Sequence, residues 1–362
     1  MGLRTVVGRV RLKVWQGQDP EDKHWGCPIR ERWGLGAHQQ MSPVLEEKLA
    51  FTATLAGSYA ATGLVAGKWG CEIDASVIHA LVQRVGGKAE AQSQARLKQL
   101  PQESPPQRRA SELGLLMLDG WFARFRGPGW GKHKTKQERV EWHEIKNGVF
   151  YLHEQAGRSA GGRGLIVDKT VVRCQGDSVE LGQRLHWEAM RAGLGRAQEK
   201  LVLGDGIAWI WKLKAKRWPD ARELLDFWHG GQHLWGLGRA CNAGDEVKTQ
   251  AWVEARLHRL RHGREQKVLQ EISALKVSRG QAGKIVRQEK NYFAGQAGRM
   301  NYKEIADRGW PIGSGPVESS CRQDQCRFRR PGQSWTKSGF GHLSAVDLAR
   351  RNNHWDELWF AG

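Results

Sequence analysis

Two apolar runs that end in Asp-Gly, LLMLDG at residues 115–120 and LVLGDG at residues 201–206, decide how this chain is expected to fold. Both have the length and composition of a buried strand, and open α/β sheets place their functional sites outside the ends of such strands. Asp119 and Asp205 stand at these ends, each beside a glycine that leaves room for a metal ion or a substrate. Asp-Gly is also a common turn dipeptide, and either pair alone is better explained as a turn. The two together in one sheet favour a site.

The segments around these runs predict an α/β layout with a mixed sheet. Three strands in hairpin arrangement are followed by helix, strand, helix and strand, which is typical of a sheet with both parallel and antiparallel neighbours. Two strands with a short turn are expected within residues 113–126, and a third strand at residues 141–154. A helix at 178–194, a strand at 199–206 and a helix at 207–219 follow. The last strand is expected at 221–229 and ends at the Gly230–Gly231 turn.

The N-terminal part of the chain predicts a strand at residues 5–15 and three helices within residues 42–87. Ser42 is expected to cap the first helix, with Pro43 at its first position. Two short helices joined by a turn have the outline of a helix-turn-helix, whose second helix enters the major groove of DNA. Any small helical domain contains such a pair, so both interpretations remain open.

A domain boundary is expected within residues 88–110, which are polar, contain three prolines and predict a helical tail that leads into a linker. Residues 1–108 then form an N-terminal strand with a helical region and linker, and residues 109–362 form the α/β domain. Within that domain, residues 232–305 have almost no strand signal. Their apolar residues recur at helical spacing, which predicts an all-helical insertion.

Composition indicates a partner with many negative charges. The 362 residues include 57 Lys and Arg against 38 Asp and Glu, a net charge of +19, which favours nucleic acid before a membrane surface. The charge alone also fits a basic ribosome-associated protein or one that is merely soluble. The sequence shows no signal-peptide pattern and no apolar run near ~18 residues, so we expect neither export nor a membrane span. Six cysteines without a CxxC pair argue against a zinc ribbon and a disulfide framework, and a reducing cytoplasm fits.

The stretch PIGSGPVESSCRQDQCRFRR at residues 311–330 places one acid ahead of several cations. Ser314 is expected to cap a helix, and Glu318 falls in its first turn, where the helix dipole favours a negative group. Arg322 and Arg329 lie on the same helix face as this acid, and arginine binds phosphate through two hydrogen bonds. An ordinary solvated basic helix with a Glu–Arg pair fits the pattern as well. The candidates for contacts with DNA phosphates are Arg322, Arg327, Arg329 and Arg330.

The runs LGDGIAWIWKL, DFWHGGQHLW and PIGSGPVESSCRQ, with the terminal RNNHWDELW, resemble bacterial insertion-sequence transposases of the DDE type, specifically the ISKra-type group. The similarity covers most of the chain, from about residues 31–35 to the C-terminus. It implies an RNase H-like catalytic core interrupted by a helical insertion, with two divalent metal ions, Mg²⁺ or Mn²⁺, held by two aspartates and a glutamate. Matched residue by residue, these are Asp119, Asp205 and Glu318. Asp168 in GLIVDK is a rival for the first position, but it ranks below because it falls in a predicted hairpin.

Asp226 and His229 also match the pattern of the family. Asp226 ends a strand that is expected beside Asp205. His229 and His233 are four residues apart, so a metal-binding pair is conceivable, although such a histidine is more often packed or orients another group. We therefore expect Asp226 and His229 to support the metal site, orienting water or a DNA end.

These observations predict a DNA transposase. Two metal ions ~3.5–4 Å apart activate the attacking oxygen and neutralise the leaving oxygen, which places the three carboxylates within ~8 Å of each other. The N-terminal helices would recognise transposon ends, while the insertion and the arginine-rich segment would follow the DNA backbone. We expect a homodimer or larger assembly on transposon-end and target DNA, without a small-molecule cofactor, in the bacterial cytoplasm at the nucleoid. The alternatives are a metal-dependent nuclease or resolvase that only hydrolyses DNA, and a domesticated DNA-binding protein without catalysis.

Overall fold

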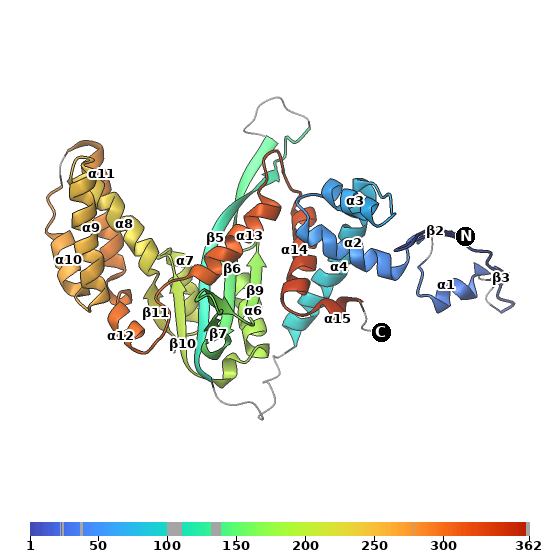
Figure 1. Cartoon of the computed structure of the whole chain (residues 1–362), viewed down its shortest axis with the longest axis horizontal. Helices are drawn as coiled ribbons and strands as arrows, with labels where there is room; N and C mark the ends of the chain where they lie inside the picture. The colour runs from blue at the N-terminus through green and yellow to red at the C-terminus, as the bar shows by residue number, and fades with distance from the viewer. Residues whose placement is uncertain are drawn as a thin grey trace. The chain divides into compact units, whose positions relative to one another are not determined.

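The structure, a computed structural model, describes residues 1–21, 23, 25–36, 39–99, 111–131, 139–277 and 279–359. The chain forms two compact units (Figure 1). The first unit comprises Met1–Lys98, Phe122–His143 and Gln323–Gly362, and the second comprises Gln99–Trp121 and Glu144–Arg322. The predicted linker lies mostly outside the described residues. No helix in the described parts of the chain is both long and apolar enough to cross a membrane.

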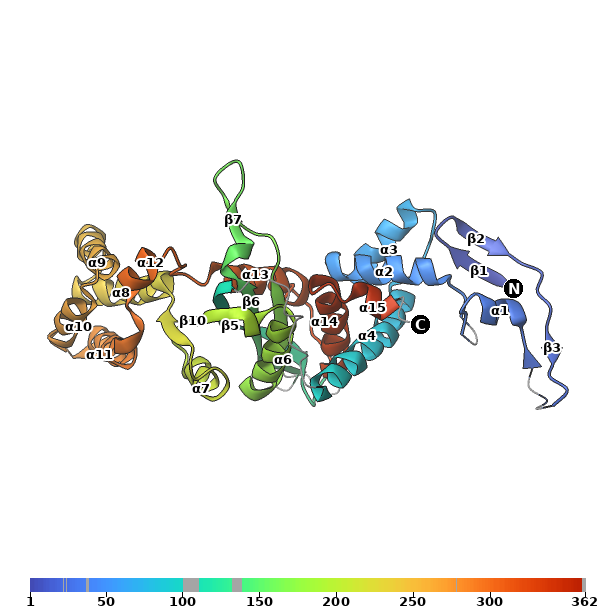
Figure 2. The same ribbon diagram turned by 90° about the horizontal axis from the view of Figure 1, so that it is seen from below.

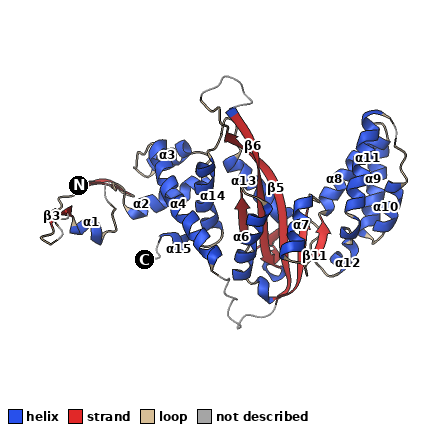
Figure 3. Cartoon of the chain, turned by 180° about the vertical axis from the view of Figure 1, so that it is seen from behind, coloured by secondary structure: helices blue, strands red, loops and turns tan. Residues whose placement is uncertain are grey.

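The central sheet has five strands in the order β11-β10-β5-β6-β9 (Figure 3). The central strand β5 (Ser111–Arg126) is parallel to β10 (Ala197–Gly204), which is parallel to β11 (Arg222–Leu225). On the other side of β5 lies β6 (Val140–Leu152), which runs antiparallel to β9 (Thr170–Cys174). The mixed α/β class predicted from the sequence is therefore confirmed.

Strand β5 corrects the expected turn at the first Asp-Gly pair. It continues through Gly120 instead of turning, because apolar residues keep alternating beyond the pair. Trp121, Ala123 and Phe125 are all at most 4% exposed, so the inward face of the strand extends to its end. The second Asp-Gly pair follows the end of β10, as predicted.

The second correction concerns the segment after β11. The strand ends at Leu225, and α8 (Phe227–Cys241) begins directly afterwards and runs through both glycines of the expected turn. Asp226 is the reason, because its side chain accepts the His229 backbone N–H and so starts a helix. Strand β9 was not predicted, whereas the predicted hairpin around Asp168 is present as β7 (Ala156–Arg158) and β8 (Gly164–Ile166).

Helices α6 (Ser178–Arg191) and α7 (Ala208–Arg217) cover one face of the sheet, and α13 (Gly315–Phe328) lies on the other (Figure 2). The apolar stripe predicted for α6 is buried against the strands. Leu118 points into this same core, and successive residues of a strand point to opposite faces. The side chain of Asp119 therefore lies on the face of α13.

The segment after β11 is all-helical, as predicted for the insertion. Its helices are α8, α9 (Glu246–Arg261), α10 (Glu265–Ser273), α11 (Gly280–Gly295) and α12 (Tyr302–Asp307). Apolar side chains at helical spacing form its core, and those buried include Val253, Leu260, Val268, Ile272 and Phe293.

The first unit is built on α2 (Pro43–Leu55), α3 (Tyr59–Lys68) and α4 (Ala75–Lys98), which are the three helices predicted there. Ser42 caps α2 as expected, with its Oγ 3.3 Å from the Leu45 backbone nitrogen. The C-terminal helix α14 (Lys337–Arg351) packs along α4. The approach is so close that a Cβ on Gly86 would lie 2.4 Å from the Cβ of His342.

The remaining elements of the first unit are short. The N-terminal strand pair predicted as one strand is β1 (Gly2–Thr5) with β2 (Gly8–Arg11), and the chain continues through β3 (Gly17–Gln18), β4 (Trp25–Gly26) and α1 (Pro28–Arg32). Helix α15 (Trp355–Trp359) closes the described chain.

Candidate active site

The register of the sheet places three aspartates in one row. Gly204 of β10 pairs with Leu118 of β5 and with Leu225 of β11. Neighbouring strands lie about 4.8 Å apart, so the residues that follow this row lie side by side at the level where β10 and β11 end. These residues are Asp119, Asp205 and Asp226.

Asp119 is a half-buried carboxylate with few neighbours that stabilise its charge. Its Oδ1 accepts the Gly120 N–H at 2.7 Å, and the Cys321 thiol of α13 forms a hydrogen bond with it. Burial raises the pKa of Asp119, and the negative charges of Asp205 and Glu318 raise it further. Asp205 and Glu318 are therefore both close enough to repel the charge of Asp119.

Asp205 occupies the turn between β10 and α7. Its Oδ1 accepts the Ile207 N–H at 3.0 Å. Burial raises the pKa of Asp205, and nearby His229 partly offsets this effect, whereas the charge of Glu144 adds to it. The site thus combines desolvated acids with one adjacent imidazole.

The backbone of this turn is held by helix α11 of the insertion. Tyr292 Oη donates to the Asp205 carbonyl at 2.8 Å, and Gln296 Nε2 donates to the Gly206 carbonyl at 2.9 Å. Gly206 has φ +95°, and a Cβ there would lie 2.8 Å from the Tyr292 hydroxyl. Only glycine combines that backbone conformation with so close a contact. The insertion therefore helps to position Asp205.

Glu318 lies in the first turn of α13, as predicted, and is half-buried. Ser314 precedes this helix, and its Oγ donates to Glu318 Oε1 at 3.2 Å. The expected cap thus holds the acid itself. This hydrogen bond orients the Glu318 side chain, whose negative charge raises the pKa of Asp119.

Asp226 is fully buried and ties two helix starts together. Its Oδ1 accepts the His229 N–H at 2.6 Å at the start of α8, and its Oδ2 accepts the Ser314 N–H ahead of α13. The backbone joins the same elements, because Asp226 N donates to Gly204 O at 2.8 Å and Phe227 N donates to Ile312 O at 3.0 Å. Both carboxylate oxygens are therefore used for positioning.

A row of polar side chains leads from His229 into the insertion. His229 Nε2 lies 3.3 Å from His233 Nε2, and His233 Nδ1 lies 2.7 Å from Glu289 Oε2. The His233 ring stacks on Tyr292 with centroids 3.7 Å apart. The two histidines are thus held by the same helix that holds the Asp205 turn.

Glu144 of β6 is a site residue that sequence reasoning missed. Its Oε1 would lie 2.7 Å from a Cβ on Gly120, and its charge raises the pKa of Asp205. Lys146 lies 2.6 Å from its other oxygen, which keeps the acid ion-paired. The available signal is a glutamate inside the strand-like run EWHEIKNGVF, in a strand predicted next to the one that carries Asp119.

The four candidate arginines differ in exposure. Arg322, Arg329 and Arg330 are exposed, whereas Arg327 is only 6% exposed and donates from Nε to the Ala53 carbonyl at 3.1 Å. Arg322 belongs to the same compact unit as the three acids, and the other three belong to the first unit. Asp168, the rival acid, is exposed beyond β8, where Gln155 Nε2 donates to it at 3.4 Å.

The acids at the sheet edge have the donor chemistry for a hard divalent ion, since Mg²⁺ prefers carboxylate oxygens. Within the described residues, no group of three or more His, Cys, Asp and Glu side chains is gathered tightly enough to hold a metal ion. The charges of Asp205 and Glu318 raise the pKa of Asp119, and a bound cation would relieve that repulsion. Their expected separation of ~8 Å stays a prediction.

The raised pKa values of Asp119 and Asp205 predict that these two acids destabilise the folded protein at neutral pH. An acid whose pKa is higher in the folded state binds its proton more readily there, so stability falls as pH rises from the unfolded-state pKa of ~3.9 through the folded one. We expect Asp119→Asn to unfold at a higher temperature than the natural sequence at pH 7.5 in EDTA. The difference should vanish towards pH 4. Asp168→Asn is the exposed control and should not change the melting temperature; a destabilised Asp119→Asn protein at pH 7.5 would contradict the argument.

Removing the Tyr292 hydroxyl is expected to loosen the Asp205 turn. Tyr292→Phe keeps the ring stacked on His233 but leaves the Asp205 carbonyl without this donor, which costs about 1 kcal/mol in the free energy of unfolding. The matched control is Tyr302→Phe, because the buried Tyr302 hydroxyl has no hydrogen-bond partner. Urea denaturation should therefore show a lower free energy of unfolding for Tyr292→Phe than for Tyr302→Phe. Equal stability losses would show that the bond to Asp205 carries no weight.

No family model matches this chain. A protein of Streptococcus gallolyticus, described as a UPF0236 protein in the vanSb 3′ region, is 23% identical to it over 359 residues. The match spans 96% of this chain and 72% of that protein. The similarity therefore extends over both compact units, and the description assigns no activity.

Proposed function

We propose that this chain is a DNA transposase of the DDE type, with an RNase H-like core that cleaves and joins DNA strands. The observation that carries the proposal is the meeting of Asp119 and Asp205 on adjacent parallel strands, with Glu318 close enough to raise the pKa of Asp119. The strand order β11-β10-β5-β6-β9 supports it, because an RNase H-like core is expected to have its first strand in the centre, the next two strands on one side and later parallel strands on the other.

Asp119, Asp205 and Glu318 would hold the two Mg²⁺ or Mn²⁺ ions of this proposal. When bound, such ions activate an attacking oxygen and stabilise the leaving oxygen of a phosphodiester. The protein's own contribution is orientation. Asp226 holds the starts of α8 and α13 beside β10, and so sets where Glu318 stands relative to Asp205.

His229 would contribute a positive or hydrogen-bonding group beside Asp205, held from behind by His233. The exposed Arg322, one helical turn after Glu318, is proposed to contact the phosphate that approaches the acids. Both assignments agree with the charge balance of the chain, whose net +19 favours a nucleic acid partner.

DNA recognition is assigned to the first unit, where α3 and α4 follow one another as a helix-turn-helix would. Because two transposon ends must be brought together, we propose a dimer or larger assembly on DNA, acting in the bacterial cytoplasm.

The test is strand joining. Purified protein is incubated in Mg²⁺ with a duplex that carries a transposon end with a free 3′-hydroxyl and with a supercoiled target plasmid. Covalent joining of the end to the plasmid is the expected result, and EDTA should prevent it. Hydrolysis without joining would favour a nuclease or resolvase, and DNA binding without either reaction would favour a non-catalytic DNA-binding protein.

A further inference from the structure

A polar cavity of about 410 Å³ in the first unit is lined by cations and hydroxyl groups. Its walls come from α3, α4, the end of β5, the end of α13 and the start of α14. Arg126, Arg327 and His79 contribute to the lining, and the described residues around it include no aspartate or glutamate. Such a lining has a positive potential that no side chain in the wall neutralises.

Several buried polar atoms of this wall lack hydrogen bonds. Both Nη atoms of Arg327 have no hydrogen-bond partner, and neither do Tyr59 Oη, Gln83 Nε2 and Ser334 Oγ. Arg327 is only 6% exposed. Buried polar groups are almost always paired in folded proteins. All of these atoms belong to residues that line one cavity, which is consistent with a ligand that supplies acceptors there.

The charge state of Arg327 agrees with a missing anion. Burial lowers the pKa of this guanidinium, and neighbouring Arg330 acts in the same direction. Tyr59 lies beside it, with its ring centroid 5.3 Å from Arg327 Cζ, but the geometry makes no hydrogen bond between the two. The charge of Asp347 stabilises the cation, although its carboxylate also forms an ion pair with Arg350.

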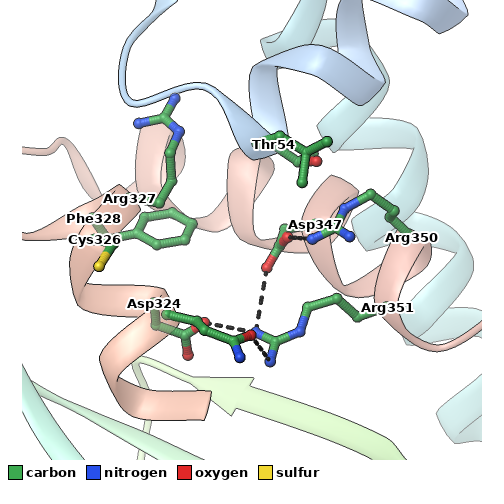
Figure 4. Close-up of a pocket in the computed structure, with 10 residues that line it drawn as sticks. Thr54, Asp324, Cys326, Arg327, Phe328, Asp347, Arg350 and Arg351 are labelled. Atoms are coloured by element: carbon green, nitrogen blue, oxygen red, sulfur yellow. Dashed lines mark hydrogen bonds and ion pairs between the residues drawn. The ribbon is translucent and has the colours of Figure 1, made fainter. Parts of the chain in front are cut away.

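A neighbouring cavity of about 270 Å³ shows the contrast (Figure 4). Arg327 also borders it, but there the charges are paired: Asp324 with Arg351 and Asp347 with Arg350, each at 2.7 Å. In Figure 4 the Arg327 guanidinium points away from this network. Its two Nη atoms, which have no hydrogen-bond partner, are therefore available to a ligand in the cavity of about 410 Å³.

Two helix starts add to the positive potential. Ser58 caps α3 and Thr336 caps α14, and both caps line the cavity. Backbone N–H groups at a helix start favour a negative ligand, phosphate above all. The ten- and fifteen-residue lengths of these helices are enough for that effect.

We propose that this cavity binds the phosphate of a nucleotide, with Arg327 and Arg126 contacting the phosphate oxygens. Tyr59 Oη and Ser334 Oγ supply further donors. The cavity is larger than a phosphate alone requires, and the rings of Tyr59 and Trp335 offer a surface for the attached base. The phosphate site stands on the cavity itself, whereas the assignment of its source to DNA rests on the proposed function.

Titration calorimetry of the full chain in EDTA tests the site without any DNA chemistry. We expect dAMP to bind and deoxyadenosine, which lacks the phosphate, to bind at least ten times more weakly. Arg126→Gln should weaken dAMP binding about tenfold and Ser334→Ala about threefold. Lys68→Gln, which removes an exposed charge at the far end of α3, is the matched control and should bind as the natural sequence does.

Arg327→Lys is the second variant, because it keeps the buried charge but loses the paired donors. It should melt as a folded protein and bind dAMP at least tenfold more weakly. Folded protein that does not bind dAMP, or the same affinity in all the cavity variants, would overturn the proposal.

Competition identifies the source of the phosphate. If a 30-base-pair duplex displaces dAMP, the phosphate belongs to DNA. If the duplex does not displace dAMP, the ligand is a free nucleotide. Both results agree with a phosphate site in this cavity. A protein that binds dAMP but never joins strands would keep this site and lose the proposed catalytic function.

Discussion

Asp205→Asn is expected to lower the rate of strand cleavage and joining at least about 10³-fold while DNA binding remains. The loss corresponds to about 4 kcal/mol of transition-state stabilisation, which is within what carboxylate-held metal ions supply. Asparagine keeps the acceptor for the Ile207 N–H, so the turn that carries residue 205 should survive the change. Asp119→Asn and Glu318→Gln should behave alike. Gel-based joining and filter-binding assays on the same preparations measure both properties.

The control for this series is Asp168→Asn, which makes the same chemical change at an exposed acid beside the β7–β8 hairpin. It should join strands at the natural rate. If Asp168→Asn were inactive and Asp119→Asn active, the first acid would have been wrongly assigned. Full activity in all three site variants would leave no catalytic role for this sheet edge.

Asp226→Ala is expected to cost about 2–4 kcal/mol in the free energy of unfolding and most of the joining activity. The carboxylate accepts two buried backbone N–H groups, and removal leaves both without a partner and α8 without its cap. The start of α13 is then no longer held at Ser314, four residues before Glu318. Urea denaturation and joining assays well below the melting temperature measure the two effects.

Two further variants separate positioning from general instability. Asp226→Asn keeps an acceptor for one N–H but not for both, so it should fold and still join strands slowly. Asp177→Ala removes another aspartate cap, the exposed one of α6, and should cost about 1 kcal/mol with no loss of activity. Equal activity losses at Asp177 and Asp226 would show that stability alone explains the effect.

The row of acids was predictable because it rests on local patterns. The apolar runs before Asp119 and Asp205 are strands, and a shared sheet edge follows from their parallel pairing. The turn expected at Gly120 was wrong, because Asp-Gly is a two-residue signal, whereas β5 continues through pairing with β6 and burial of its alternate residues. Local turn preference lost to long-range strand pairing.

The support around the acids was not predictable in the same way. Tyr292 and Gln296 lie on an insertion helix about ninety residues after the turn that they hold, and no sequence period links the two. Glu144 becomes a site residue only once β6 is known to lie beside Gly120. Asp226 matched the family pattern, but the use of both its oxygens by two helix starts emerges only from the folded chain.

The attachment of α11 to the Asp205–Gly206 turn matters to anyone who would make this protein smaller. The helices between β11 and α13 look dispensable to a designer, because they interrupt the sheet domain in sequence. Deleting them would also remove the two hydrogen bonds that hold the turn of the candidate site.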